Sequence, residues 1–323
     1  MIRRSRTKEP EVTVAVQKQA VRQVAAVSVD ADLVARLPED GRRGEVHSVH
    51  EHVINLRTPD GLLCCLASAV LDDAPRTIRV DAAAWPALRW HRGDTVRFGP
   101  GPVLRPAPGG VDVVLAGAER RQPPATDLSA VGPDRLRAAA AVIAGLLPMP
   151  AERSPFEAAA AEVLGRRTAG LAAVIRHHDR DSAAVTPAVS AAATALVGLG
   201  AGLTPSGDDV LTGLAVVAAA DEGRLGAVRA GIVRALTAGA PLEERTTAVG
   251  AAMLTEAAAG RARWRIHDLL TTIATTAPGG PELRAAVLAV RAIGHTSGTD
   301  VLEGVRLGLL AAADLTPDLK EYR

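Results

Sequence analysis

Hydrophobic and polar positions follow two different patterns in the two parts of this chain. Up to about residue 117, short β-rich runs such as "EVHSVHEHVINL", "LLCCLA" and "DTVRFG" are separated by turns rich in Gly, Pro and Asp. From about residue 134, longer segments rich in Ala and Leu are separated by Gly or Pro. Short strands joined by tight turns are typical of a barrel or sandwich, whereas the longer segments predict helices. The pattern therefore predicts an α+β protein, with a small antiparallel β domain (barrel or sandwich) followed by an all-helical domain.

A Pro-rich passage between the two patterns predicts the domain boundary. We expect a β-rich domain over residues 1–118, a linker over 119–133 and a helical domain over 134–323. The principal helices expected in the last part cover 206–221, 224–239, 243–259, 265–276, 281–293 and 298–313. Several of them are too uniformly apolar for surface helices, so we expect them near the centre of the domain.

One short polar string occurs twice, each time at the start of an expected apolar helix. "SGDDVLTG" at 206–213 and "SGTDVLEG" at 297–304 agree at six of eight positions. The first copy predicts a capping box, with Ser206 as N-cap and Asp209 three residues later, and the second copy has the same spacing. Capping alone would stabilise each helix by about 1 kcal/mol.

Capping does not explain Asp208 or the Gly-rich stretch "GLGAGLTP" that precedes the first copy. Helix N-termini present N–H groups and the positive ends of their dipoles, which favour anions. Carboxylates beside them are able to hold a metal ion or accept a proton. Two such helix starts, if they face each other, would form a pocket for a small anion, whereas starts that only cap their helices would have a purely structural role.

The sequence resembles a known family at these same residues. "GLGAGLTPSGDDVLTG" at 198–213 is similar to the signature of the AllH-like family, long catalogued as a bacterial domain of unknown function. "GEVHSVHEHVINL", "RTTAVGAAMLTEAAAG" and "GHTSGTDVLEG" extend the resemblance over most of the chain. The resemblance implies a role in purine and allantoin nitrogen catabolism, as one of three subunits of oxamate carbamoyltransferase. That enzyme interconverts oxamate plus carbamoyl phosphate with oxalurate plus phosphate.

Site residues are expected from the two helix starts and one arginine. The expected catalytic residues are Asp208, Asp209 and Asp300. The expected substrate-binding residues are Gly202, Thr204, Ser206, Gly207, Arg245, Thr296, Ser297 and Gly298. Arg245 is suited to pairing with a carboxylate, although beside Glu243 and Glu244 it is equally typical of an exposed arginine. Asp208 and Asp209 would hold Mg²⁺ if the reaction requires it, and no other cofactor is expected.

Composition excludes several other classes of function. The chain has 37 Lys and Arg against 36 Asp and Glu, and only 2% aromatic residues. Such a chain lacks the basic surface and stacking platforms typical of nucleic-acid binding. Its apolar runs are shorter than the roughly 20 residues of a membrane span, and its adjacent cysteines form no zinc motif. We expect a soluble, cytoplasmic protein whose partners are small anions and other subunits, with no nucleic acid and no membrane.

Three functions stay open on the sequence. The first is a subunit of a carbamoyltransferase-type enzyme that binds its substrate at the paired helix starts. The second is a non-catalytic scaffold or metabolite-sensing subunit with the same fold. The third is a stand-alone lyase or carboxylase-like enzyme that acts on small acids without partners.

Overall fold

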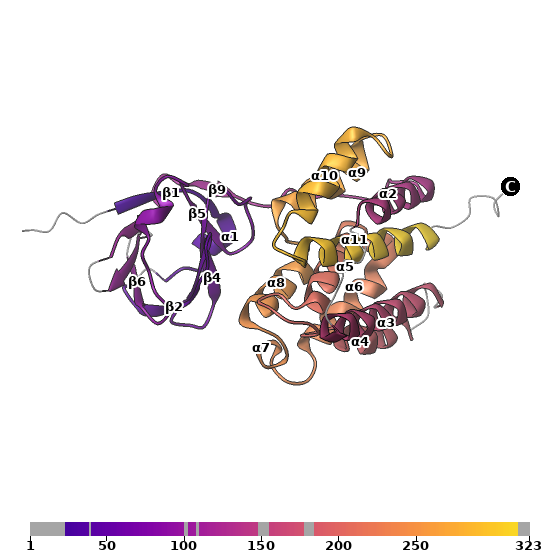
Figure 1. Cartoon of the computed structure of the whole chain (residues 1–323), viewed down its shortest axis with the longest axis horizontal. Coiled ribbons are helices and arrows are strands. Elements are labelled where there is room, and N and C mark those ends of the chain that lie inside the picture. Colours follow the sequence, from indigo (N-terminus) through magenta and orange to yellow (C-terminus); the bar gives the residue numbers. More distant parts are fainter. Residues whose placement is uncertain are drawn as a thin grey trace, which may run out of the picture.

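A β domain lies beside a domain of helices in the computed structural model of the chain (Figure 1). The structure describes residues 23–38, 40–99, 103–107, 110–147, 155–177 and 184–315. Within this part of the chain, no helix is both long enough and apolar enough to cross a membrane.

The β domain is a closed barrel. Its strands are β1 (Gln23–Asp30), β2 (Arg43–Val49), β3 (Val53–Arg57), β4 (Leu63–Ser68), β5 (Thr77–Val80), β6 (Thr95–Gly99), β7 (Val103–Ala107), β8 (Asp112–Val114) and β9 (Glu119–Arg121). They are ordered β5-β4-β3-β2-β6-β7-β8-β1-β9, and an additional β1–β5 pairing closes the sheet on itself. The first half of β1 pairs with β8 and its second half with β9, so β9 continues the barrel edge along β1. Of the two predicted alternatives, barrel and sandwich, the β domain is therefore a barrel.

The prediction of an antiparallel sheet is correct for most pairs and wrong for three. β4 and β5 are parallel, and β1 is parallel to both β8 and β9. Turn signals in a sequence specify only hairpins between consecutive strands. The β1 pairings join strands far apart in the chain, and the β4–β5 connection crosses over instead of forming a hairpin, so neither leaves a turn signal.

The barrel is filled by apolar side chains. Leu33 of α1 (Ala31–Val34) and the strand residues Ile54, Leu66, Ile78 and Phe98 are fully or almost fully buried in one cluster. Strand residues enter this cluster because alternate side chains of a strand point to the same face of the sheet. This core gives the β domain an interior separate from that of the helices.

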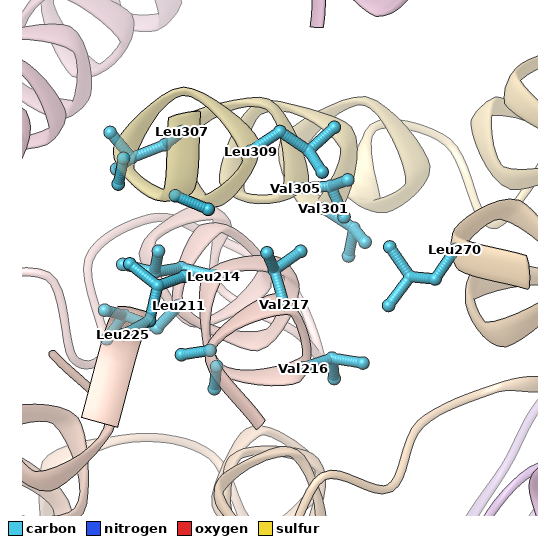
Figure 2. Packing of buried hydrophobic residues seen from close by; sticks show 14 of the residues in the cluster. Leu211, Leu214, Val216, Val217, Leu225, Leu270, Val301, Val305, Leu307 and Leu309 are labelled. Atoms are coloured by element: carbon cyan, nitrogen blue, oxygen red, sulfur yellow. The ribbon is translucent and has the colours of Figure 1, made fainter. Parts of the chain in front are cut away.

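The helical domain is built around one central helix. Its helices are α2 (Pro133–Leu146), α3 (Pro155–His177), α4 (Val185–Thr194), α5 (Ser206–Ala220), α6 (Glu222–Thr237), α7 (Leu242–Arg245), α8 (Ala248–Ala258), α9 (Trp264–Thr275), α10 (Pro281–Arg291) and α11 (Ser297–Asp314). Every residue of α5 from Gly207 to Ala218 is buried. Figure 2 shows Val301 and Val305 of α11 close to Val217 of α5, within the shared core.

The six expected helices agree with the structure to within a few residues, except that 243–259 is divided. α7 ends at Arg245, Thr246 has extended backbone, and α8 begins at Ala248. Thr247 is the N-cap of α8, and its Oγ1 accepts a hydrogen bond from Gly250 N–H at 2.9 Å. Thr247 therefore starts a new helix, and the hydroxyl of Thr246 binds outside both helices, as described next.

Candidate functional site

The starts of α5 and α11 lie side by side because glycines let the two helices approach closely. A Cβ atom added at Gly213 would lie 2.1 Å from the carbonyl oxygen of Val301. In the reciprocal contact, a Cβ atom added at Gly304 would lie 2.0 Å from the carbonyl oxygen of Val210. No side chain other than the hydrogen atom of glycine fits at either position. The helices therefore touch main chain to main chain.

The two helices run in the same direction. Near their starts, Thr204 Oγ1 and Ser297 Oγ share a hydrogen bond of 2.8 Å. About three turns further along, a Cβ atom added at Gly308 of α11 would lie 2.8 Å from Cβ of Val217 in α5. Contacts thus stay in step along the pair, which places both N-termini at one end.

Asp209 is the buried carboxyl group at this meeting point. The residue is only 1% exposed, and neither carboxylate oxygen has a hydrogen bond of good geometry with a described residue. Burial, with smaller contributions from the charges of Asp300 and Asp208, raises the pKa of Asp209 to about 7. The hydroxyls of Ser297 and Thr204 lie near enough to lower the pKa in part, but in the structure they hydrogen-bond to each other. Asp209 is therefore a carboxyl group able to exchange its proton near neutral pH.

Asp208 has a different environment, although it is the next residue. Its Oδ1 accepts a hydrogen bond from Gly198 N–H at 2.7 Å, and its Oδ2 accepts one from the hydroxyl of Thr246. Burial raises the pKa of Asp208, and these two hydrogen bonds and the charge of Arg245 oppose the rise. A Cβ atom added at Gly250 would lie 2.4 Å from Oδ2. The contacts of Asp208 join the loop before α5 to the break between α7 and α8.

The Gly-rich loop before α5 needs glycine for its backbone conformation. Gly198, Gly200 and Gly202 have φ angles of +72°, +125° and +96°. Residues with a Cβ atom rarely adopt this region of backbone conformation. A Cβ atom added at Gly198 would also lie 2.1 Å from the carbonyl oxygen of Arg245. The hydroxyl of Thr247 donates to the carbonyl oxygen of Leu203, which fixes the loop to α8. The glycines therefore serve the shape of the loop.

The predicted capping boxes are wrong. Ser206 is the first residue of α5, with Pro205 as N-cap, and no side chain caps the helix. At α11 the N-cap is Thr296, again without a side-chain cap. The first-turn amides find carbonyl oxygens of the preceding loops instead, such as Gly207 N–H with Leu199 at 2.8 Å. Asp209 is thereby left without a capping role.

These loop contacts also bear on the prediction that backbone amides bind an anion. The N–H group of Gly298 donates to the carbonyl oxygen of Ile293 at 2.9 Å, the counterpart of the Gly207 contact. Both amides are occupied within the chain, so neither offers a donor to a ligand in this conformation. The candidate donors at the site are instead the hydroxyls of Thr204 and Ser297.

The remaining predicted residues surround this point at different depths. Thr296 and Gly202 are exposed, whereas Ser206 and Asp300 are half-buried. Among the described residues, no group of three His, Cys, Asp or Glu side chains is arranged to hold a metal ion. Thr246 and Gly250 were not predicted, and the only sequence signal for them is the small and polar composition of "RTTAVG".

Arg245 is half-buried, and among the described residues it forms no ion pair with a carboxylate. Its Nη1 donates to the carbonyl oxygens of Ala235 at 2.8 Å and Ala238 at 3.2 Å. Its Nη2 is buried and has no hydrogen-bond partner within the described part of the chain. A buried N–H donor without a partner is uncommon in proteins and suits an acceptor that arrives with a ligand.

Comparison with known proteins gives a family for both domains. Residues 25–120 match the family model described as AllH family N-terminal domain. Residues 196–309 match the model described as oxamate carbamoyltransferase subunit AllH, and this match contains both helix starts. The comparison with solved structures found no match for the chain. The two family matches coincide with the barrel and with the core of the helical domain, and the chain belongs to the AllH family.

Proposed function

We propose that this chain is a catalytic subunit of an oxamate carbamoyltransferase in purine nitrogen catabolism, and that Asp209 is its proton acceptor. The observation that supports the proposal is the buried carboxyl group of Asp209, whose pKa is raised to about 7 and whose oxygens lack well-formed hydrogen bonds. Asp209 lies where the starts of α5 and α11 meet, and both helix starts fall within residues 196–309, which match the family model. General bases with a pKa near the working pH are the most effective.

The transfer reaction needs such a base. The amide nitrogen of oxamate attacks the carbonyl carbon of carbamoyl phosphate, and a C–N bond forms. The C–O bond to phosphate breaks, and phosphate leaves with the electron pair. The attacking nitrogen must lose one proton, which Asp209 accepts in its ionised form. The products are oxalurate and phosphate, so atoms and charges balance.

The neighbouring groups supply the remaining contacts in this proposal. Thr204 and Ser297 share one hydrogen bond, and the hydroxyl proton that this bond does not use is donated to the oxamate carboxylate; the orphaned Nη2 of Arg245 is a further candidate donor. Asp300 increases the basicity of Asp209 through its charge. Asp208 acts as a positioning residue, because its two oxygens hold the loop and the α7–α8 break.

The test replaces Asp209 in the assembled transferase. Asp209→Asn keeps the shape of the side chain and removes its proton exchange. We expect the carbamoyl transfer rate to fall about 10²- to 10⁴-fold, the range usual for loss of a general base. We also expect the wild-type rate to rise with pH through about 7 and this rise to disappear in the variant.

Two controls separate catalysis from folding and assembly. Glu303→Gln changes a carboxylate on α11 that pairs with Arg306 of the same helix, and it should leave the rate unchanged. Size-exclusion chromatography should show that Asp209→Asn still assembles with its partner subunits. Unchanged turnover and unchanged oxamate affinity in Asp209→Asn would exclude Asp209 as the base.

A scaffold function is the second candidate, and one observation favours it. The amides of Gly207 and Gly298 are satisfied within the chain, as expected of helix starts that serve only packing. A scaffold subunit would tolerate Asp208→Asn and Asp209→Asn with little loss of activity in the assembled enzyme. The same assay therefore decides between the two candidates.

A further inference from the structure

A row of three arginines crosses the outer face of the barrel. Arg43 of β2 is paired in register with Arg97 of β6, and Arg97 is paired in register with Arg105 of β7. All three residues are exposed. Residues directly opposite each other on neighbouring strands share one face of the sheet, so the three guanidinium groups leave the barrel on the same side. In Figure 1, β6 lies on the side of the barrel that faces away from the helices. We call these three residues the arginine row.

The chain itself neutralises only one end of the arginine row. Arg105 Nε lies 3.0 Å from Asp112 Oδ2. Among the described residues, Arg43 and Arg97 have neither an ion pair nor a side-chain hydrogen bond, and Glu45 on the same strand as Arg43 forms no ion pair with them. Like charges directly opposite each other on neighbouring strands destabilise a sheet. Contacts within the row therefore oppose the stability of the barrel, and the donors of two guanidinium groups stay available.

The length and the borders of the arginine row limit what fits on it. Neighbouring strands lie about 4.8 Å apart, so the row is roughly 10 Å long, more than one phosphate or carboxylate group spans. Glu45 lies beside the row and Asp112 at its end, where their charges would repel a long polyanion such as nucleic acid. The exposed residues of β2 and β6 include no Phe, Tyr or Trp on which a base would stack. A short acidic patch on a protein surface fits these limits.

We propose that the arginine row docks an acidic surface patch of another subunit of the transferase. The proposal rests on the transferase assignment under the proposed function, but not on the role of Asp209. The family model that matches the helical domain is described as a subunit, so other chains are the expected partners of an exposed surface. Guanidinium groups donate paired hydrogen bonds to carboxylates, and complementary charges raise the association rate and fix the register of an interface. Arg43 and Arg97 make the central contacts, because no acidic side chain of the chain occupies them.

The test measures association of the full chain with the other transferase subunits. Rate constants are measured by surface plasmon resonance in about 50 and 300 mM NaCl. Salt screens exposed charges, so the wild-type association rate constant should fall about tenfold between the two conditions. Arg43→Gln combined with Arg97→Gln should lower the rate constant in low salt about tenfold and remove most of its salt dependence.

Two further double variants separate charge at this place from charge in general. Arg43→Lys with Arg97→Lys keeps both charges, so it should retain the association rate and its salt dependence while dissociating faster. Arg234→Gln with Arg284→Gln removes two charges from exposed arginines of α6 and α10, and it should associate like the wild type. The glutamine variant of the row should melt at or above the wild-type temperature, because it removes opposed like charges.

Three outcomes would overturn the docking proposal. The first is an association rate and salt dependence in the glutamine variant of the row equal to those of the wild type. The second is an equal loss in the Arg234 and Arg284 control. The third is a loss of binding to a DNA duplex, but not to the subunits, in the row variant.

The same measurements separate this proposal from the proposed function. Wild-type association that does not depend on the arginine row overturns only the docking proposal. No association of the wild type with the other subunits overturns the transferase assignment as well. Asp209→Asn should associate as the wild type does, so the role of Asp209 and the docking surface can fail independently.

Discussion

At the scale of single residues, the raised pKa of Asp209 makes the stability of the protein depend on pH. This pKa is raised from 3.8 to about 7 by folding. Between these two pH values the folded protein holds a proton that the unfolded chain has released. The free energy of unfolding should therefore fall as pH rises through this window and level off above pH 7. The decrease is roughly 4 kcal/mol if this group alone titrates.

Asp209→Asn should remove most of this dependence, because the amide does not ionise. At pH 8 the variant should be more stable than the wild type, and at pH 4 the two should be nearly equal. Chemical denaturation over this pH range measures the difference. Asp221→Asn is the matched control, because Asp221 is also buried but pairs with Arg224 at 2.5 Å. It should lower stability at pH 8, and the same sign of effect in both variants would contradict the account of Asp209.

The sequence directed attention to residues that lie close together in the structure, but it did not distinguish their environments. Asp208, Asp209, Thr204 and Ser297 all come together, because a distinctive polar string stands between apolar segments. The difference between Asp208 and Asp209 was not predictable, since it depends on Thr246, a distant residue in the chain. Neighbouring carboxylates on one helix point in different directions, and only the tertiary structure decides which of them has partners.

At the scale of elements, the contact between α5 and α11 should be very sensitive to added volume. Gly213→Ala would place a methyl group against the carbonyl oxygen of Val301, and Gly304→Ala against that of Val210. We expect each to destabilise the protein by roughly 1–3 kcal/mol or more, the range for overpacked cores. Urea denaturation measures the loss.

Gly226→Ala in α6 is the control for helix propensity. A Cβ atom there would meet only the flexible side chain of Glu222, at 3.8 Å. Alanine stabilises a helix interior relative to glycine by about 0.5–1 kcal/mol, so this variant should be slightly more stable. Destabilisation by Gly226→Ala equal to that by Gly213→Ala would mean that helix contact is not the cause.

The elements themselves were largely predictable, because apolar segments bounded by Gly and Pro are strong signals for helices. The break at Thr246 was not predicted, because it combines the local N-cap of α8 at Thr247 with a hydrogen bond from Thr246 to the distant Asp208. The capping boxes failed for a similar reason. The Ser206 hydroxyl was expected to accept a hydrogen bond from a backbone N–H group in the first turn of α5. Those N–H groups donate to backbone carbonyl oxygens instead.

At the scale of the whole molecule, charged side chains join the barrel to the helices. Arg261 lies 2.8 Å from Asp30 of β1 and 2.8 Å from Glu256 of α8. Glu256 also pairs with Arg76 of the barrel at 2.6 Å. Asp30 is only 5% exposed, so its charge depends on these partners. The cluster links the barrel and the helices into one unit through charges that depend on partners in the other domain.

Arg261→Gln should weaken this unit. Removing one partner of a buried ion pair typically costs about 3–5 kcal/mol, because the other charge stays buried without compensation. We expect a lower melting temperature and faster proteolytic cleavage in the linker around 122–127. Arg306→Gln, which breaks a pair within α11, should change stability by about 1 kcal/mol or less. Equal effects of the two variants would show that the domains do not depend on the Arg261 cluster.

The main-chain contact between α5 and α11 also affects the entropy of ligand binding. Ordering a flexible side chain at a binding site costs about 0.5–1.5 kcal/mol. Gly213 and Gly304 have no rotamers to order, and they hold the helix starts at one separation before any ligand arrives. Under the proposed function, a substrate that binds beside Thr204 and Ser297 would meet groups whose spacing is already fixed. Its binding enthalpy would then have to offset little conformational entropy of the protein, so modest contacts would be sufficient for a small molecule.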